Sequence, residues 1–338
     1  MTAWYVVVPA VAGLGIAAGV LIFVYAFPGK PKIGVIHVPY TVINELSAYG
    51  ITEQLHYALR DDSIKAVVIK LNSPGGTATA SERLYLETRA LREKKPVVVV
   101  MNDLVASGGF LMAMGASYLY AQPSSITGNV GVVSRIGPFI PSIPSESVVF
   151  SGPHKLDGGT RREWIASTDR LKGRFVQIVV TERGDRLNIS GDELAKGSTY
   201  YGTEAVTLGL ADEIGTDSHA IEKAGELAGI SRYDLVDVNL EVQREFFESL
   251  RRVLEPLETG GDSDLADALA LLARDSKGGD TLPDASGAEP HAGVPTLQHL
   301  RRLMLYGTLD MGQEDPIPDF PMEIGRPNAY YLYVGHGP

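Results

Sequence analysis

The chain has 338 residues, with 30 basic and 41 acidic side chains, a formal net charge of −11 and no cysteine. The absence of cysteine excludes a disulfide scaffold, a thiol nucleophile and a cysteine-ligated zinc or iron–sulfur site. The acidic balance argues against nucleic acid as the main partner, because binding to phosphates depends on lysine and arginine. The length is sufficient for one large or two modest domains with a substantial core.

An apolar run close to the N-terminus predicts a membrane anchor. Residues 4–27 contain no charged side chain. A helix of this length, at about 1.5 Å per residue, reaches roughly 36 Å, which exceeds the roughly 30 Å of a bilayer core. A cleaved signal peptide fits less well, because no basic residue precedes the run and no small-x-small cleavage site ends it. We therefore expect a retained, single-pass transmembrane helix within residues 1–29; the side of the membrane that carries the rest of the chain stays open.

After residue 30 the hydrophobic pattern is that of an α/β domain, in which short apolar runs alternate with amphipathic stretches of helical length. The first block predicts strands at 33–38, 65–71, 96–101 and 118–122, with helices at 43–60, 78–94 and 106–116. The second block predicts strands at 130–135, 148–152 and 236–240, with helices at 168–186, 218–228 and 242–257. Because the strands are continuous rather than alternating apolar runs, we expect a mostly parallel sheet with helices on both faces.

The composition changes at Thr259. Residues 259–295 are rich in Gly, Asp, Ser, Ala and Pro, which is typical of a flexible linker. Residues 296–338 regain Leu, Met and Tyr but carry several prolines, so we expect an extended C-terminal tail. The prediction is therefore an anchor (1–29), a globular domain (30–258), a linker and a tail.

Three glycine-rich motifs fall where α/β enzymes place their sites, just beyond the ends of predicted strands. They are NSPGGT (72–77), VASGGF (105–110) and SITGNVGV (125–132). None of them has the pattern of a phosphate-binding loop, so nucleotide binding is disfavoured.

Ser107 is the most conspicuous residue in these motifs. Two glycines follow it, so a bend at this point would hold its hydroxyl at a helix N-terminus, where backbone N–H groups stabilise a developing negative charge. An ordinary N-cap serine is the alternative. Gly75 and Gly76 likewise fit either a turn after Pro74 or a backbone that approaches an oxyanion closely.

A serine nucleophile needs a base, which is usually histidine. The globular part offers four histidines: His37, His56, His154 and His219. None of them forms a recognisable Ser/His/Asp set. A lysine can serve instead when burial keeps it neutral, because loss of solvation disfavours the charged form. Lys155 follows the predicted strand 148–152 and is the candidate; a solvated surface lysine is the alternative.

The order of the motifs resembles that of one family. NSPGG, VASGGF, TGNVGVV, SGPHKLDGG and YYGTEAVTLGLADEIG follow one another between residues 33 and 235. This succession is similar to that of the signal peptide peptidase A (SppA) family, whose members are membrane-anchored Ser/Lys-dyad peptidases with the ClpP/crotonase-like fold. The resemblance implies that residues 30–258 form an SppA-like peptidase domain.

The resemblance also implies roles for individual residues. Ser107 would be the nucleophile and Lys155 the general base. The N–H groups of Gly76 and Gly108 would form the oxyanion hole. Asn129 stands where family members often carry a serine that orients the lysine, and its side-chain oxygen can accept the same hydrogen bond.

Further implications concern partners and substrates. The resemblance implies a homo-oligomer with active sites near subunit boundaries, hydrophobic peptide or membrane-protein substrates, and no cofactor or metal. His154 stands where the family more often has an aromatic residue before the lysine. We hypothesise that the Leu/Tyr-rich end of the tail lies in a neighbouring hydrophobic substrate groove and regulates access.

Two alternatives to a peptidase stay open. A crotonase-type acyl-CoA enzyme shares the fold and the oxyanion chemistry, but it explains neither the anchor nor the pairing of Ser107 with Lys155. A catalytically inactive membrane scaffold of the same fold is the other. A lysine base is idle while protonated, so the peptidase hypothesis predicts activity that rises from acid toward alkaline pH.

Overall fold

The computed structural model describes residues 29–134, 151–155, 158–259 and 329–332, together with Trp4, residues 12–16 and Ala18. The strands are β1 (Lys32–Val38), β2 (Val42–Ile43), β3 (Ile64–Ser73), β4 (Gly75–Thr77), β5 (Val97–Ala106), β6 (Tyr118–Ala121), β7 (Ile126–Gly128), β8 (Val133–Ser134), β9 (Thr199–Tyr201), β10 (Glu213–Ile214), β11 (Asp234–Asp237) and β12 (Ala329–Leu332). The helices are α2 (Glu45–Arg60), α3 (Ala78–Arg92), α4 (Gly108–Ala113), α5 (Arg161–Arg183), the 3-10 turn η1 (Gly184–Arg186), α6 (Gly191–Leu194), α7 (Gly202–Thr207), α8 (Asp217–Leu227) and α9 (Val238–Thr259).

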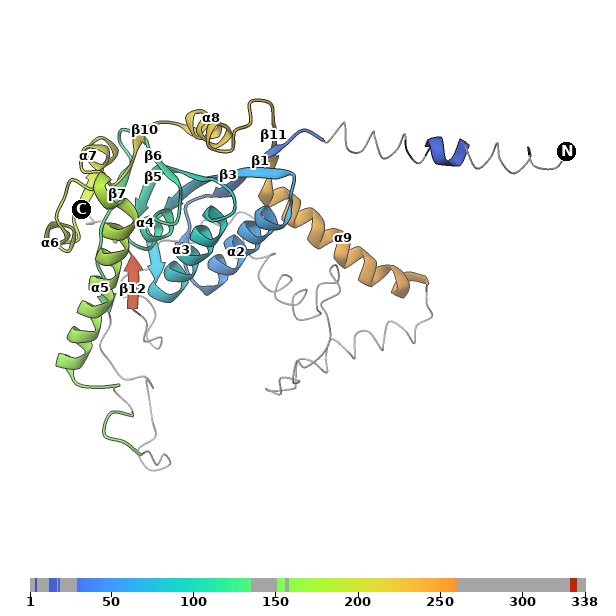
Figure 1. Cartoon of the computed structure of the whole chain (residues 1–338). Helices are drawn as coiled ribbons and strands as arrows, with labels where there is room; N and C mark the ends of the chain where they lie inside the picture. Colours follow the sequence, from blue (N-terminus) through green and yellow to red (C-terminus); the bar gives the residue numbers. More distant parts are fainter. Residues whose placement is uncertain are drawn as a thin grey trace.

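The main sheet has the order β10-β6-β5-β3-β1-β11, and all of its neighbouring strands are parallel. Strand β7 adds to the end of β5 in parallel, and β9 pairs antiparallel with β7. A second, small sheet has the order β2-β4-β12-β8 (Figure 1). The expected mixed α/β fold with a mostly parallel sheet is therefore confirmed.

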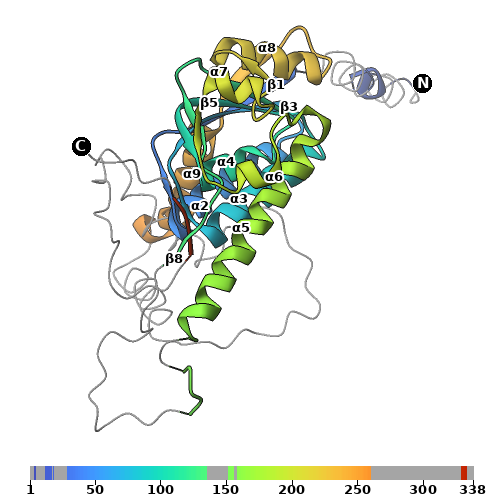
Figure 2. The ribbon, with the colours of Figure 1, turned by 90° about the vertical axis from the view of Figure 1, so that its left-hand side faces the viewer.

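Helices cover both faces of the main sheet (Figures 1 and 2). The valine run of β5 shows why, because successive side chains of a strand point to opposite faces. Val97 and Val99 belong to the core cluster that includes side chains of α2, α3 and α4. Val98 and Val100 pack in a second cluster with Ala220 and Ala224 of α8. All four valines are fully buried, as the continuous apolar pattern predicted.

Several element boundaries differ from the predicted ones, and local backbone chemistry gives the reason. Of the predicted strand 130–135, only Val133–Ser134 forms a strand (β8); a separate short strand, β7, precedes it and ends at the positive φ angles of Gly128 and Asn129. Strand β11 ends at Asp237, whose carboxylate accepts a hydrogen bond from the backbone N–H of Leu240 in α9. Helix α5 begins earlier than predicted, because Thr160 forms a capping box with the third helical residue. Of the predicted strand 148–152, residues 148–150 lie outside the described residues and the remainder is not a strand.

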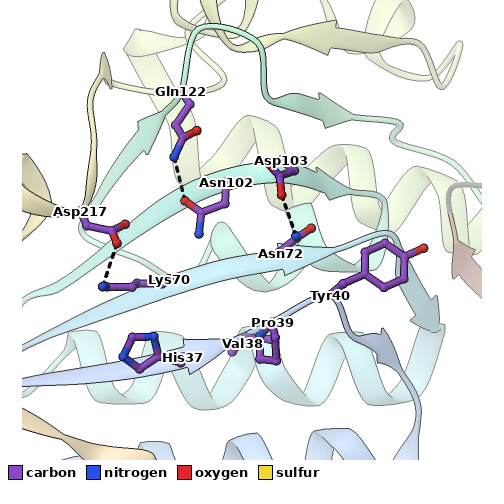
Figure 3. Close-up of a pocket in the computed structure, with 10 residues that line it drawn as sticks. All are labelled: His37, Val38, Pro39, Tyr40, Lys70, Asn72, Asn102, Asp103, Gln122 and Asp217. Atoms are coloured by element: carbon purple, nitrogen blue, oxygen red, sulfur yellow. Dashed lines mark hydrogen bonds and ion pairs between the residues drawn. The ribbon is translucent and has the colours of Figure 1, made fainter. Parts of the chain in front are cut away.

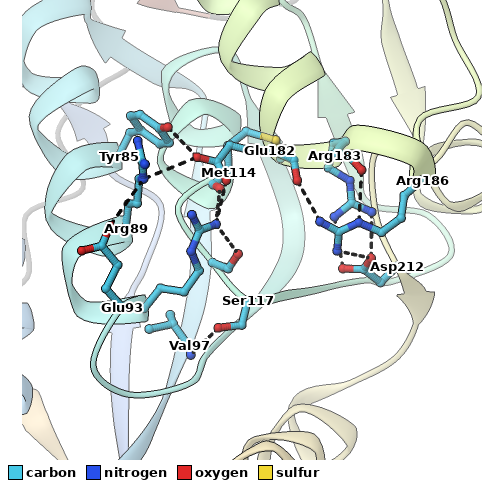
Figure 4. Close-up of polar contacts among 12 residues, drawn as sticks. Tyr85, Arg89, Glu93, Val97, Met114, Ser117, Glu182, Arg183, Arg186 and Asp212 are labelled. Carbon is cyan, nitrogen blue, oxygen red and sulfur yellow. Dashed lines mark hydrogen bonds and ion pairs between the residues drawn. The ribbon is translucent and has the colours of Figure 1, made fainter.

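A buried ion pair fixes the C-terminal half of α5 to the sheet (Figure 4). The guanidinium of Arg183 donates to both carboxylate oxygens of Asp212 at 2.8 and 3.2 Å, and to the carbonyl of Gly209 at 2.6 Å. The same carboxylate accepts the backbone N–H of Leu119 in β6 at 2.8 Å. Arg183 is only 3% exposed, and these bonds compensate its buried charge.

A second polar cluster joins α3 to α5 at Glu182 (Figure 4). Its carboxylate accepts hydrogen bonds from Tyr85 at 2.6 Å and from Arg92 at 2.8 Å. Burial alone would raise the pKa of Glu182, but these two bonds and the charges of Arg92 and Arg89 outweigh it and hold the pKa below its ordinary value. Helix α5 is therefore held at its C-terminal end, while most of its N-terminal half is exposed or half-buried.

In the described parts of the chain, no helix combines the length and the apolar character that crossing a bilayer requires. Most of the predicted anchor at 4–27 lies outside those parts, since only Trp4, residues 12–16 and Ala18 of it are described. The anchor therefore stays a prediction. The same holds for the linker at 259–295, of which only Thr259 is described.

Candidate active site

The three glycine-rich motifs meet at one place in the structure. Strand β3 pairs with β5 through Ser73 and Val105, and β5 pairs with β7 through Val105 and Thr127 and then through Ala106 and Gly128. The hydroxyl of Thr127 also donates to the carbonyl of Val105 at 2.7 Å. The motifs at 72–77, 105–110 and 125–132 are thus neighbours at the ends of parallel strands, where the sequence predicted a site.

Ser107 occupies the sharp bend between β5 and α4. Its φ of 53° and ψ of −120° lie in a region that non-glycine residues rarely adopt. The backbone is held on both sides, because the N–H of Ser107 donates to Gly128 at 2.9 Å and its carbonyl accepts from Leu111 at 2.9 Å. The residue is 1% exposed, and its hydroxyl makes no capping bond to α4. Ser107 is therefore not an ordinary N-cap serine, which would have extended backbone and a capping hydroxyl.

Two glycines near Ser107 are required by close backbone approaches. A Cβ atom on Gly76 would collide with the carbonyl oxygen of Ile43 in the paired strand β2. A Cβ atom on Gly109 would lie 2.7 Å from the carbonyl oxygen of Ser73. Each glycine therefore lets its segment pack directly against a neighbouring backbone, and both segments border the serine.

Ser73 is a site residue that the sequence analysis did not single out. Its hydroxyl donates to the carbonyl of Thr41 at 2.6 Å and accepts the backbone N–H of Gly75 at 3.1 Å. Gly75 has a φ of 103°, so this hydroxyl stabilises the turn that leads into Gly76. The signal in the sequence was the position of the serine at the end of a strand, immediately before Pro-Gly-Gly.

Asn129 lies next to this arrangement, on the far side of β5 from β3. Its φ is 54°, and its backbone N–H donates to Ser198 at 2.8 Å. Its side-chain amide donates to the carbonyl of Gly197 at 2.8 Å. These bonds fix Asn129 to the loop that precedes β9, and its predicted role toward a lysine stays a prediction.

Lys155 lies apart from the serine. It is exposed, in a turn where its backbone N–H donates to Gly152 at 3.2 Å, and the carbonyl of His154 accepts from Gly158 at 2.8 Å. The segment 151–155 lies beyond the N-terminal end of α5 and away from the sheet (Figures 1 and 2). The structure thus brings Ser107, Gly76, Gly108 and Asn129 into one region and leaves Lys155 outside it.

The other described histidines have different partners. His56 contacts Glu87 at 2.9 Å, and the backbone N–H of His37 donates to Asn239 at 2.9 Å. His219 contacts Thr216 at the start of α8. These contacts agree with the absence of a recognisable Ser/His/Asp set in the sequence.

A separate polar pocket of about 480 Å³ lies on the main sheet near the carboxyl ends of β1, β3 and β5 (Figure 3). Within it Lys70 forms an ion pair with Asp217 at 2.7 Å, and the side-chain amide of Asn72 donates a hydrogen bond to Asp103 at 3.3 Å. Ser107 does not line it. The described residues contain no cluster of three side chains suited to hold a metal ion. The bend at Ser107, where the three glycine-rich motifs meet, is the candidate active site.

Two protease family models match the part of the chain that contains the three glycine-rich motifs. The family model for peptidase family S49 matches residues 89–231, which include Ser107, and the model for Clp protease matches residues 34–127. A solved structure of the 1510-N membrane-bound stomatin-specific protease with a substrate peptide overlaps 62% of this chain and 89% of its own, with a TM-score of 0.41 and 17% identity.

Relatives of known sequence are more similar. A putative protease of Synechocystis sp. is 33% identical over 221 residues, which are 61% of this chain and 76% of the relative. A putative protease of Methanocaldococcus jannaschii is 32% identical over 56% of this chain and 64% of its own length. Protease 4 of Haemophilus influenzae is 35% identical over 58% of this chain and 35% of its own, so the chain spans less than two thirds of these last two relatives. By these similarities and the parallel sheet that carries Ser107, the chain belongs to peptidase family S49, the SppA family of serine proteases.

Proposed function

We propose that this chain is a membrane-anchored serine endopeptidase that cleaves hydrophobic peptides, such as signal-peptide remnants and segments of membrane proteins. The observation that carries the proposal is the backbone of Ser107. A serine with a positive φ, buried at a strand-to-helix bend between two glycine-rich turns, has the strained backbone that is typical of catalytic nucleophiles.

In the proposed reaction, the hydroxyl oxygen of Ser107 attacks the peptide carbonyl and forms an acyl-enzyme. The N–H groups of Gly76 and Gly108 stabilise the oxyanion, and losing one such donor typically lowers the rate by roughly 10²–10³. Lys155 accepts the serine proton and delivers it to the leaving amine. Water then hydrolyses the acyl-enzyme and regenerates Ser107.

The proposed dyad requires Lys155 to approach Ser107, and we propose that assembly into a homo-oligomer brings the two together. The N-terminal half of α5, which follows the lysine segment, is mostly exposed in the single chain. Ile165 in this half is 45% exposed, so a neighbouring subunit would bury apolar surface there. Asn129 would then hold the lysine amine through its side-chain oxygen.

The remaining parts of the chain complete the proposal. Residues 1–29 anchor the protein in the membrane, residues 30–258 form the peptidase domain, residues 259–295 are a linker and residues 296–338 are a tail. No cofactor takes part in the proposed reaction.

The test uses the full-length protein in lipid nanodiscs with a panel of hydrophobic fluorogenic peptides. We expect the parent to cleave at least one peptide, and Ser107→Ala and Lys155→Ala to abolish cleavage. Lys172→Ala is the matched control: this lysine lies on α5, pairs with Asp169 at 3.0 Å and has no proposed role. Activity that rises from pH 5 to pH 9 supports a lysine base. Cleavage that survives Lys155→Ala would assign the base to another group, and absence of both cleavage and acylation of Ser107 would favour the inactive scaffold.

A further inference from the structure

We infer that Tyr200 is a positioning residue, whose ring holds the strained backbone of Ser107 in place through Gly128. This inference rests on the proposed function, which it deepens by naming a residue outside the three glycine-rich motifs on which the nucleophile depends. Tyr200 is the middle residue of β9 and lies opposite Thr127 of β7 in the antiparallel pair.

The backbone of Ser107 depends on its surroundings. A non-glycine residue with a φ of 53° is strained, and such a conformation persists only where neighbouring groups hold it. On the N-terminal side, the hold is the hydrogen bond from the N–H of Ser107 to the carbonyl of Gly128 at 2.9 Å. The position of Ser107 is therefore only as well defined as that of Gly128.

Gly128 needs packing from outside to fix its position. It is the last residue of β7, it has a φ of 88°, and glycine has more backbone freedom than any other residue. The ring of Tyr200 supplies the packing, because a Cβ atom on Gly128 would lie 2.8 Å from Cδ2 and 3.3 Å from Cε2 of that ring. The ring therefore lies over the Cα atom of Gly128 and fills the place of the missing side chain.

Strand β9 is itself fixed at both ends, so the ring has a firm support. Before the strand, the carbonyl of Ser198 accepts the backbone N–H of Asn129 at 2.8 Å. After it, Gly202 packs so closely that a Cβ atom there would collide with the carbonyl oxygen of Gln122. The ring also packs against the main hydrophobic core. The rigidity of the core is thereby transmitted to Gly128.

The ring of Tyr200, rather than its hydroxyl, makes the contact with Gly128. Burial, and to a lesser extent the charge of Glu193, raises the pKa of the phenol, so Tyr200 stays neutral between pH 5 and pH 9. It therefore does not serve as the base of the proposed reaction in this range. We expect phenylalanine to replace Tyr200 without loss and alanine to fail.

The kinetic test uses full-length variants in nanodiscs, at a temperature at which each is folded. We expect Tyr200→Ala to lower kcat by about tenfold, because a misplacement of about 1 Å can lower a rate by about 10²-fold and the missing ring permits part of such a shift. KM should stay within about twofold of the parent. Tyr200→Phe should keep the kcat of the parent, and both variants should keep its pH–rate profile. A Tyr200→Phe enzyme as slow as Tyr200→Ala would assign the effect to the hydroxyl and overturn the inference.

The matched control is Tyr233→Ala. Tyr233 is half-buried, as Tyr200 is, and makes the same kind of contact, since a Cβ atom on Gly225 of α8 would lie 2.9 Å from its Cε1. It belongs to the second core cluster, on the other face of the sheet from α4. We expect Tyr233→Ala to keep the kcat of the parent. Equal losses of kcat in Tyr200→Ala and Tyr233→Ala would assign the effect to lost packing in general and overturn the inference.

Hydrogen exchange tests the same hold without any substrate. Opening of the bond between Ser107 and Gly128 exposes an amide to exchange. We expect Tyr200→Ala to speed exchange in segment 105–110 by about tenfold or more, while segment 97–101 of the same strand keeps the rate of the parent. Equal acceleration of the two segments, or none, would overturn the inference. If Tyr200→Ala does not fold, Tyr200→Leu is measured in the same way.

The outcomes separate this inference from the proposed function. If Tyr200→Ala speeds exchange only around Ser107 but no variant cleaves any peptide, the positioning stands and the proposed protease activity fails. If the parent cleaves peptides through Ser107 but Tyr200→Ala keeps the kcat of the parent, the protease stands and the inference about Tyr200 is wrong.

Discussion

The contact between α4 and β3 predicts a large effect from a single methyl group at Gly109. This glycine is the second residue of α4, two positions after Ser107. A Cβ atom there would lie 2.7 Å from the carbonyl oxygen of Ser73 and 2.9 Å from its Cβ atom. Ordinary contacts begin at 3.4 Å, so the helix and the strand must separate by about 0.7 Å in Gly109→Ala.

That separation has two consequences. Overpacking a buried contact of this kind costs about 1–3 kcal/mol of unfolding free energy. The displacement also moves Ser107 and Gly108 relative to Gly76, and because a misplacement of about 1 Å can lower a rate by about 10²-fold, we expect kcat to fall by roughly 10- to 100-fold. The loss of rate should therefore exceed what the loss of folded protein explains.

The assay combines urea unfolding with initial rates on a fluorogenic peptide, measured where both variants are fully folded. The control is Gly50→Ala in α2, where a Cβ atom meets nothing within 4 Å. Replacing glycine by alanine in an exposed helix should stabilise it by up to about 1 kcal/mol and leave kcat unchanged. A Gly109→Ala enzyme with the stability and rate of the parent would show that α4 does not press against β3 and would refute the reasoning.

Three further variants test the groups that hold the site in place. Asp212→Asn leaves the buried charge of Arg183 uncompensated, so urea unfolding should show that the unfolding free energy falls by about 3–5 kcal/mol. The control is Glu193→Gln in an exposed ion pair, which should change the unfolding free energy by less than about 0.5 kcal/mol. The pKa of Glu182 lies below its ordinary 4.5 in the folded state, so the ionised carboxylate stabilises the fold above pH 4.5, and this stabilisation is lost as the pH falls through the pKa of the folded state. The difference in unfolding free energy between the parent and Glu182→Gln should therefore shrink from pH 6 to about pH 3. Ser73→Ala removes the acceptor for the N–H of Gly75, so we expect a loss of about 1–3 kcal/mol and slower acylation of Ser107, read by unfolding and by a serine-reactive probe.

The main sheet was predictable because its pattern depends only on neighbouring residues. The run Val97–Met101 is apolar at every position, which only a strand covered on both faces can bury, and the structure places helices on both of its faces. Boundaries were less predictable, because they depend on single side chains. The carboxylate of Asp237 starts α9 where the apolar pattern alone would have continued the strand.

The candidate site was predictable in part. The motifs located Ser107, Gly76 and Gly108, and strand pairing brings their segments together. The alternative of an N-cap serine could not be excluded from the sequence, since the distinguishing features are a φ angle and an unused capping interaction. Ser73 was missed because its importance comes from a hydrogen bond to Thr41, which is 32 positions away in the chain.

The positions of Lys155 and β12 could not be predicted from the sequence. The sequence motif points to Lys155 as the base, yet the fold of one chain leaves it exposed, beyond the N-terminal end of α5. The tail carries no catalytic motif, yet its strand β12 pairs with the strand that contains Gly76. Both segments lie outside the main sheet, whereas Ser107 directly follows its strand β5. A rigid sheet can keep a strained nucleophile in place without keeping it active. We therefore expect activity to depend on an event away from the sheet, the arrival of Lys155 at Ser107.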